Sequence, residues 1–108
     1  MDRSLKVAAI TGAYGGLGRA LSFLLRDRGF TLLVGGRNQI QLDKLVEELG
    51  DNTRVCGFLL DVRKSDQCER FIATAEEKFG RLDVLINAAG LLTLEDVETM
   101  KDESLKDT

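Results

Sequence analysis

The sequence of 108 residues contains no proline, no histidine and no tryptophan, and it has only two cysteines and a single tyrosine. The lack of histidine, together with cysteines that are not closely paired, argues against a zinc site, and we expect no metal. No apolar run reaches the roughly 18 residues of a membrane span, and no secretory leader pattern is present. We therefore expect a cytoplasmic protein in which Cys56 and Cys68 are reduced core thiols rather than a disulfide.

The charge balance argues against a nucleic-acid-binding protein. With a formal net charge of −3 and 44% apolar residues, the composition is that of a globular domain with one modest core. Residues 93–108 hold six acidic residues and two lysines, so this acidic tail accounts for the negative charge. Neither part of the chain carries the basic surface that nucleic-acid binding requires, and we expect neither a nucleic-acid nor a membrane partner.

Short apolar runs alternate along the chain with longer segments of helical period. We expect strands at residues 7–11, 31–35, 55–60 and 84–87, and helices at residues 17–28, 40–49 and 65–79. Gly29, Gly50 and Gly80 follow the helical segments, where a helix commonly ends in a left-handed residue, and Asn38 with Gln41 has the spacing of a capping box. Strands joined by helices require right-handed crossovers, so the sequence predicts an α/β fold with a doubly wound, Rossmann-like parallel sheet.

The stretch TGAYGGLG, residues 11–18, joins the first predicted strand to the first predicted helix. In a doubly wound sheet the ligand binds at the carboxyl ends of the strands, and the first such turn holds a phosphate. Gly12 fits a tight turn there, Gly16 lets a phosphate approach the backbone, and Gly18 lets the helix lie close to the sheet. The spacing G-x-x-x-G-x-G differs from the commoner G-x-G-x-x-G, and a plain tight turn is the alternative for this stretch alone.

The end of the second strand is expected to distinguish NADP from NAD. An acidic residue there, about 20 residues after the glycines, reads a free ribose 2′-hydroxyl, whereas an arginine accommodates a 2′-phosphate. The sequence at that place is Gly36-Arg37-Asn38, with no carboxylate to repel a phosphate. We therefore expect Arg37 and Asn38 to contact NADP rather than NAD, the alternative being that Arg37 is an ordinary surface residue.

Three motifs, in this order, resemble those of the classical short-chain dehydrogenase/reductase family. TGAYGGLG resembles the family's TGxxxGxG loop, Asp61-Val62 its acid-plus-aliphatic pair after the third strand, and Asn87-Ala88-Ala89-Gly90 its NNAG or NAAG motif. Residues 5–92 are thus similar to the N-terminal half of that family. The resemblance implies a fold of this type, NAD(P) as the cofactor, and a reaction that reduces a carbonyl or oxidises an alcohol.

The resemblance also implies roles for individual residues. In the family, the position of Asp61 hydrogen-bonds the adenine amino group, and the stretch at Asn87 helps to hold the sheet and lines the adenosine site. Tyr14 lies inside the glycine-rich loop, and from that place we expect it to flank the adenosine phosphate. From the residues alone, Asp61 could instead start a turn or cap a helix, and Asn87 could simply end a strand. The predicted cofactor-binding residues are Gly12, Tyr14, Gly16, Leu17, Gly18, Arg37, Asn38, Asp61, Val62, Asn87, Ala88, Ala89 and Gly90.

The family's catalytic segment has no counterpart in the sequence. Members resemble one another in a Tyr-x-x-x-Lys pair preceded by a serine, which together move a proton and bind the nicotinamide ribose. Here Tyr14 is followed four positions later by Gly18, and Ser104 comes too early to match that serine. We expect no catalytic residue in this chain, which leaves two hypotheses. It is the N-terminal portion of an NADP(H)-dependent oxidoreductase, catalytically incomplete as given, or it is a non-catalytic nucleotide-binding or protein-association module.

These patterns also predict how the chain is organised and how it associates. Residues 1–92 are expected to form a dinucleotide-binding βαβαβαβ half-domain truncated after the fourth strand, and residues 93–108 an acidic tail that starts the next helical region. The strand at residues 84–87 would then be an apolar sheet edge with unpaired backbone groups. We expect it to pair with a second copy, fourth strand against fourth strand, to give a homo-oligomer, or with a missing C-terminal half.

Overall fold

A computed structural model of the chain describes residues 5–50, 53–88 and 93–96. All seven predicted elements are present, and no end differs from its prediction by more than one residue. In chain order the elements are β1 (Val7–Thr11), α1 (Gly16–Asp27), β2 (Thr31–Gly36), α2 (Gln39–Leu49), β3 (Val55–Leu59), α3 (Ser65–Phe79), β4 (Val84–Asn87) and β5 (Thr93–Asp96).

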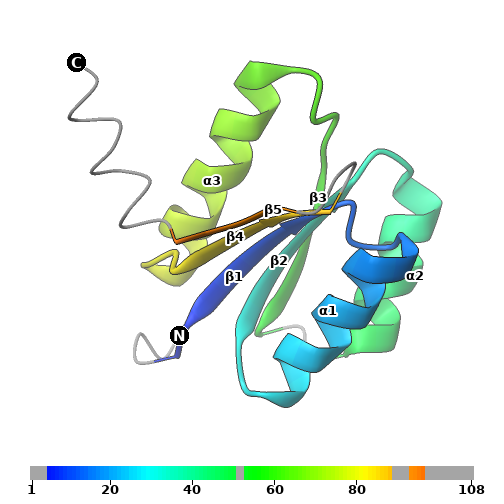
Figure 1. Ribbon diagram of the computed structural model, residues 1–108, viewed down its shortest axis with the longest axis vertical. Coiled ribbons are helices and arrows are strands. Elements are labelled where there is room, and N and C mark those ends of the chain that lie inside the picture. The colour runs from blue at the N-terminus through cyan, green and yellow to red at the C-terminus, as the bar shows by residue number, and fades with distance from the viewer. Residues whose placement is uncertain (1–4, 51–52, 89–92, 97–108) are drawn as a thin grey trace.

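The strands form one sheet in the order β3-β2-β1-β4-β5, in which the first four are parallel. Helices α1 and α2 lie on one side of this sheet and α3 lies on the other (Figure 1). The strand order places β1 in the middle, so the turn that follows it lies between the ends of β2 and β4. The fold is therefore the doubly wound, Rossmann-like parallel sheet that the alternation of strands and helices predicts.

The two central apolar runs of the sequence become strands β1 and β2, which are buried on both faces. All five residues of β1 are buried, and successive side chains of a strand point to opposite faces of the sheet. Ala8 and Ile10 pack in the cluster beneath α1 and α2, whereas Val7 and Ala9 pack in the cluster beneath α3. Helices on both faces thus explain why this strand is continuously apolar rather than alternating.

The ends of the helices follow the predicted signals. Gly29, Gly50 and Gly80 have positive φ angles of 88°, 71° and 82°, a region that favours glycine. The side-chain oxygen of Asn38 accepts a 3.1 Å hydrogen bond from the backbone N–H of Gln41, which caps α2. These local features mark where the three helices stop and where α2 starts.

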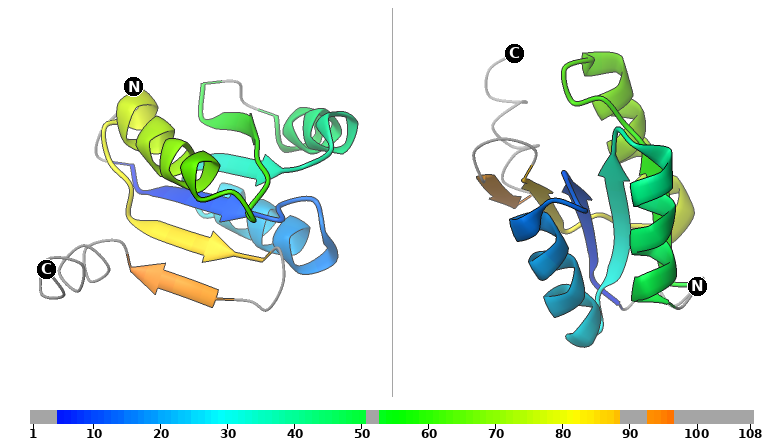
Figure 2. Two further views of the ribbon diagram at one scale, coloured as in Figure 1. Left: turned by 90° about the horizontal axis from the view of Figure 1, so that it is seen from above. Right: turned by 90° about the vertical axis from the view of Figure 1, so that its right-hand side faces the viewer.

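Strand β5 was not predicted, and it corrects the expectation of a free edge at β4. Residues Thr93–Asp96 pair antiparallel with β4, with Val84 opposite Asp96 and Asn87 opposite Thr93 (Figure 2). The sequence TLED lacks the apolar pattern of the other strands, but backbone pairing along an edge does not require one. The predicted dimer of two fourth strands is therefore wrong for this arrangement, because β5 occupies that edge. The domain boundary at residue 92 stays a prediction.

Both cysteines are free, half-buried thiols. They pack against the edge of the core cluster beneath α3 rather than inside it. Within the described ranges, no helix has the length and apolar character needed to cross a membrane. Over the same residues, no three His, Cys, Asp or Glu side chains gather in a way that could hold a metal ion.

Candidate functional site

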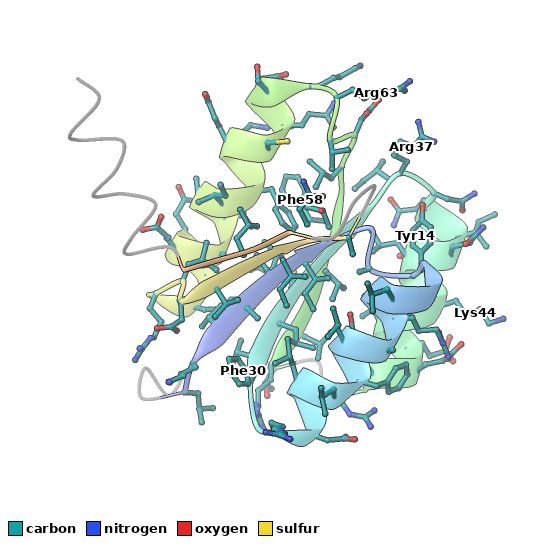
Figure 3. The ribbon with its side chains drawn as sticks, viewed as in Figure 1. Tyr14, Phe30, Arg37, Lys44, Phe58 and Arg63 are labelled. Atoms are coloured by element: carbon teal, nitrogen blue, oxygen red, sulfur yellow. The ribbon has the colours of Figure 1, made fainter. Side chains whose placement is uncertain are left out.

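A hollow of about 430 Å³ lies where the carboxyl ends of the parallel strands meet. The side chains of Tyr14, Arg37 and Arg63, which come from three different turns, lie at this end of the sheet (Figure 3). The hollow is lined by Gly12, Tyr14, Gly15, Gly36, Arg37, Leu60, Asp61, Val62, Arg63 and Ala88. Parallel strands bring the residues that follow them to one edge, which is why segments far apart in the sequence meet here.

The glycine-rich loop forms the floor of the site between β1 and α1. Gly12 has a φ of 63° and its carbonyl accepts a 3.1 Å hydrogen bond from the N–H of Gly15, so the chain turns tightly as predicted. A Cβ atom on Gly18 would lie 2.1 Å from the carbonyl oxygen of Gly12. Gly18 therefore permits close approach of α1 to this loop, whereas the prediction had placed that contact on the sheet.

Gly16 differs from Gly18 because it faces open space. A Cβ atom built on Gly16 would meet no atom within 4 Å. Gly16 is also the first residue of α1, and the first N–H groups of a helix have no acceptor within the helix. These N–H groups and the positive end of the helix dipole suit an anion at this point.

Tyr14 connects the glycine-rich loop to the turn between β2 and α2. Its hydroxyl oxygen accepts hydrogen bonds from the backbone N–H groups of Arg37, at 3.1 Å, and Asn38, at 2.9 Å. Next to it, the N–H of Ala13 donates a 3.1 Å bond to the carbonyl of Gly35. The two turns are thus held together, and this role of Tyr14 was not visible in the sequence.

Asp61 follows β3 and is held by Arg63. The guanidinium of Arg63 donates to both carboxylate oxygens of Asp61, at 3.0 and 2.9 Å, and the backbone N–H of Arg63 donates to Oδ1 at 3.0 Å. The N–H of Asp61 in turn donates to the side-chain oxygen of Gln67 at 2.8 Å. Asp61 therefore does start the turn, as the local alternative held, and it does so while lining the hollow.

The carboxyl of Asp61 remains ionised under ordinary conditions. Hydrogen bonds from the side chain and the backbone of Arg63 hold its pKa well below the usual range, against an opposing effect of burial. The charge of Arg37 lowers this pKa further. An ionised carboxylate accepts hydrogen bonds only, so Asp61 offers an acceptor to a ligand that brings an N–H donor.

At the other side of the hollow, β1 and β4 are joined at their carboxyl ends. The hydroxyl of Thr11 donates a 2.8 Å hydrogen bond to Oδ1 of Asn87, and the N–H of Ala88 donates a 3.1 Å bond to the carbonyl of Thr11. Asn87 thus holds the sheet, as expected, while Ala88 lines the hollow. Ala89 and Gly90 of the same motif lie outside the described residues.

The structure brings six of the predicted residues to the hollow and leaves five others beside it. Gly12, Tyr14, Arg37, Asp61, Val62 and Ala88 line it. Asn38 lines an adjoining hollow that it shares with Tyr14 and Arg37. Four predicted residues do not line either hollow, namely Gly16, Leu17, Gly18 and Asn87.

Four lining residues were missed by the sequence analysis, namely Gly15, Gly36, Leu60 and Arg63. The position of Arg63, two residues after an acid at a strand end, is a local signal that could have indicated its pairing with Asp61. The set as a whole provides backbone N–H groups, two guanidinium groups and one carboxylate. Such groups suit the binding of a nucleotide, whose phosphates are anionic and whose base carries donors.

Comparison with known proteins agrees with this geometry. A family model described as short chain dehydrogenase matches residues 6–108. An uncharacterized oxidoreductase of Staphylococcus saprophyticus is 39% identical over 98 residues, which cover 91% of this chain and 39% of that protein. A 3-oxoacyl-(acyl-carrier-protein) reductase of Thermotoga maritima is 36% identical over 99 residues, which cover 91% of this chain and 40% of the relative.

Solved structures of related proteins have a similar fold over most of this chain. A variant of the actinorhodin polyketide ketoreductase with NADPH aligns with a TM-score of 0.76 and 31% identity, covering 82% of this chain and 34% of that one. A 3-ketoacyl-(acyl-carrier-protein) reductase of Brucella melitensis complexed with NADH aligns with a TM-score of 0.68 and 28% identity. The alignment covers 74% of this chain and 32% of the reductase. The chain spans about two fifths of the length of the curated relatives it matches.

Proposed function

The chain belongs to the short-chain dehydrogenase/reductase family, and from this we propose that it binds NADP(H) as the cofactor-binding portion of an oxidoreductase that interconverts a carbonyl and an alcohol. The observation that carries the proposal is the meeting of Gly12, Arg37 and Asp61 at one hollow on the carboxyl edge of the sheet. In doubly wound folds a dinucleotide binds at this edge. Related proteins whose structures contain NADPH or NADH support the same class of ligand.

In the proposed binding mode, each part of the nucleotide meets a group of suitable chemistry. The pyrophosphate lies at the start of α1, in the open space next to Gly16. The adenine amino group donates to the ionised carboxylate of Asp61, which Arg63 holds in place. A 2′-phosphate on the ribose lies near Arg37, whose guanidinium binds phosphate by charge-assisted hydrogen bonds.

The preference for NADP over NAD rests on the end of β2. Only Gly36 and Arg37 of this turn line the hollow, and neither supplies a carboxylate to accept from a ribose 2′-hydroxyl. The carboxylate that does line it, Asp61, comes from the next strand and is already paired with Arg63. Positive charge without a competing acid therefore favours the phosphorylated ribose.

The hollow contains binding groups rather than reacting groups, and we propose that hydride transfer needs further residues. The hydroxyl oxygen of Tyr14, the single tyrosine, accepts two backbone hydrogen bonds at the ribose end of the site. A phenol in this place is far from the nicotinamide of the proposed binding mode. The alternative of a non-catalytic nucleotide-binding module is not favoured, because the family model and the similar proteins are those of dehydrogenases and reductases.

The proposal is tested by titrating the full chain with NADPH and, separately, with NADH. Cofactor fluorescence measures the binding in each titration. We expect NADPH to bind, and to bind more tightly than NADH. Failure to bind either cofactor would overturn the proposal. A second assay measures NADPH oxidation in the presence of simple aldehydes and ketones. We expect no turnover, and measurable turnover by the pure chain would contradict the proposal that hydride transfer needs further residues.

Self-association is also part of the proposal, although not through β4. Among the described strands, β3 and β5 are the outer ones, and each has a single neighbour in the sheet. The apolar strand β3 (VCGFL) therefore presents an edge that a second copy can extend by strand pairing. Analytical ultracentrifugation over a hundredfold range of concentration tests this, and a monomer throughout would exclude it.

A further inference from the structure

We propose that Tyr14 and Gly36 act as a matched pair that sets cofactor selectivity. The ring of Tyr14 fills the space that a side chain at position 36 would need, and the hydroxyl proton of Tyr14 is presented to a phosphate on the ribose. This inference rests on the proposed binding of a nicotinamide dinucleotide at the same hollow.

The first support is steric. A Cβ atom on Gly36 would lie 2.2 Å from Cε1 of Tyr14 and 2.9 Å from both Cδ1 and Cζ of the same ring. Gly36 is not among the glycines with positive φ, so its backbone conformation does not itself demand glycine. What demands glycine at position 36 is the aromatic ring that lies above it.

The second support follows from where Gly36 lies. It is the last residue of β2, the place at which a dinucleotide-binding fold carries the acid that reads the ribose 2′-hydroxyl. With the Tyr14 ring in this position, no aspartate or glutamate fits there. Tyr14 thus excludes the group that would favour NAD and repel a 2′-phosphate.

The third support is the hydrogen bonding of the phenol. A tyrosine hydroxyl has one proton to donate and two lone pairs that accept. Both lone pairs of Tyr14 are engaged by the N–H groups of Arg37 and Asn38, so its proton is the one group left to offer a ligand. That proton is a donor in the same two hollows that Arg37 lines.

The Tyr14 hydroxyl is also fixed in position before any ligand binds. Its two hydrogen bonds and the adjacent bond between Ala13 and Gly35 tie the glycine-rich loop to the β2–α2 turn. A donor that is already oriented loses little conformational freedom when it meets its acceptor. An anionic 2′-phosphate gains more from such a donor than a neutral hydroxyl does, because hydrogen bonds to ionised acceptors are stronger.

The first test removes only the hydroxyl. Tyr14→Phe keeps the ring over Gly36, and we expect the ratio of NADH to NADPH dissociation constants to fall about tenfold, the size of one hydrogen bond to a charged group. Ile40→Ala serves as the control, because Ile40 is 81% exposed on α2 and touches neither hollow. An unchanged ratio in Tyr14→Phe would overturn the proposed role of the hydroxyl.

The second test exchanges the pair. Gly36→Asp alone is expected to lower the melting temperature, because its side chain collides with the Tyr14 ring. The double variant Tyr14→Ser with Gly36→Asp removes the ring, and we expect it to regain stability and to bind NADH more tightly than NADPH. A single Gly36→Asp variant as stable as the parent, or a double variant that still prefers NADPH, would overturn the pairing.

The two proposals fail in different ways. If the parent chain binds neither NADPH nor NADH, the proposed function is wrong and the selectivity pair has no ligand to act on. If the parent binds NADPH but the Tyr14 and Gly36 variants leave the cofactor ratio unchanged, the cofactor assignment stands and the paired role is wrong. The melting temperatures separate both results from simple unfolding.

Discussion

The hydroxyl of Thr11 and the side-chain oxygen of Asn87, 76 positions apart in the sequence, form a 2.8 Å hydrogen bond that joins the carboxyl ends of β1 and β4. Thr11 is buried, with 6% of its surface exposed, and its carbonyl accepts the N–H of Ala88 as well. The bond therefore joins β1 and β4 directly before Gly12 and Ala88, two residues that line the hollow. It holds together two motifs that the sequence analysis placed at the same site.

This bond predicts an energetic coupling between the two residues. Because Asn87 has other interactions too, a single variant cannot isolate the bond, and a cycle of Thr11→Val, Asn87→Ala and the double variant is needed. We expect a coupling of about 0.5–1.5 kcal/mol in the free energy of unfolding, measured by urea denaturation. Additive effects of the two substitutions would contradict the bond's contribution.

Two glycines of the loop should respond in opposite ways to the same substitution. Gly18→Ala places a methyl group 2.1 Å from the carbonyl oxygen of Gly12, and we expect a loss of about 1–3 kcal/mol in unfolding free energy. Gly16→Ala meets no neighbour within 4 Å and should leave stability equal or slightly higher, yet weaken NADPH binding because the methyl group enters the phosphate's space. Equal melting temperatures for the two variants would be inconsistent with this geometry.

Arg37 is expected to recognise the 2′-phosphate. Arg37→Ala should weaken binding of 2′,5′-ADP by about 1.5–3 kcal/mol and leave 5′-AMP binding nearly unchanged, because only the former carries the phosphate near the guanidinium. Arg28→Ala is the control, since Arg28 is exposed at the end of α1 and lines neither hollow. Calorimetric titrations in which both ligands weaken equally would refute the assignment.

Asp83 should make stability depend on pH in the acidic range. Its carboxylate accepts from the N–H of Val7 at 2.8 Å and from Arg81 at 2.6 Å; although burial raises its pKa, these bonds outweigh burial and lower it. A lowered pKa in the folded state means that the stabilisation is complete above the unfolded value of about 3.9 and is lost as the pH falls through the folded value.

The matched variant for this effect is Asp83→Asn. We expect it to be less stable than the parent by about 1–2 kcal/mol near pH 7, with the difference constant down to about pH 5 and shrinking below about pH 4. Urea unfolding of both proteins from pH 3 to pH 7 measures the difference. A gap that does not change with pH would assign the effect to packing rather than to charge.

Removal of β5 should expose the edge of β4 and promote association. A chain that ends at residue 92 leaves the outer side of β4 without its antiparallel partner, and unpaired strand edges template pairing with other chains. A chain that ends at residue 96 keeps β5 and is the control. Sedimentation velocity should give a larger, concentration-dependent mass for the shorter chain, whereas identical behaviour would mean that β5 does not protect the edge.

Seven elements and most of the site were predictable because their signals are local. Short apolar runs mark the strands and apolar residues at helical spacing mark the helices, each within a short window of sequence. The glycine after each helix marks its end. Parallel strands then bring Gly12, Arg37 and Asp61 to one edge without any knowledge of side-chain geometry. The order of strands and helices alone therefore predicts which residues gather at the hollow.

The parts that escaped prediction depend on contacts across the fold. Strand β5 exists through pairing with β4 and has no apolar pattern of its own. The hydrogen bonds of Tyr14 join segments 23 and 24 residues apart, so no sequence window contains both partners. Gly36 looks like an ordinary strand glycine until the ring above it is seen.

The pairing of β5 with β4 also has a consequence for timing. The two strands are neighbours in sequence, and a hairpin of this kind forms in about 1–10 μs, whereas a parallel partner has to be carried back by a crossover of a dozen or more residues. As the polypeptide leaves the ribosome, at about 5–20 residues per second, β5 reaches β4 before any later segment can compete. A later strand can pair with this edge of β4 only by displacing β5. The rate of that pairing is then limited by the rate at which the β4–β5 hairpin opens.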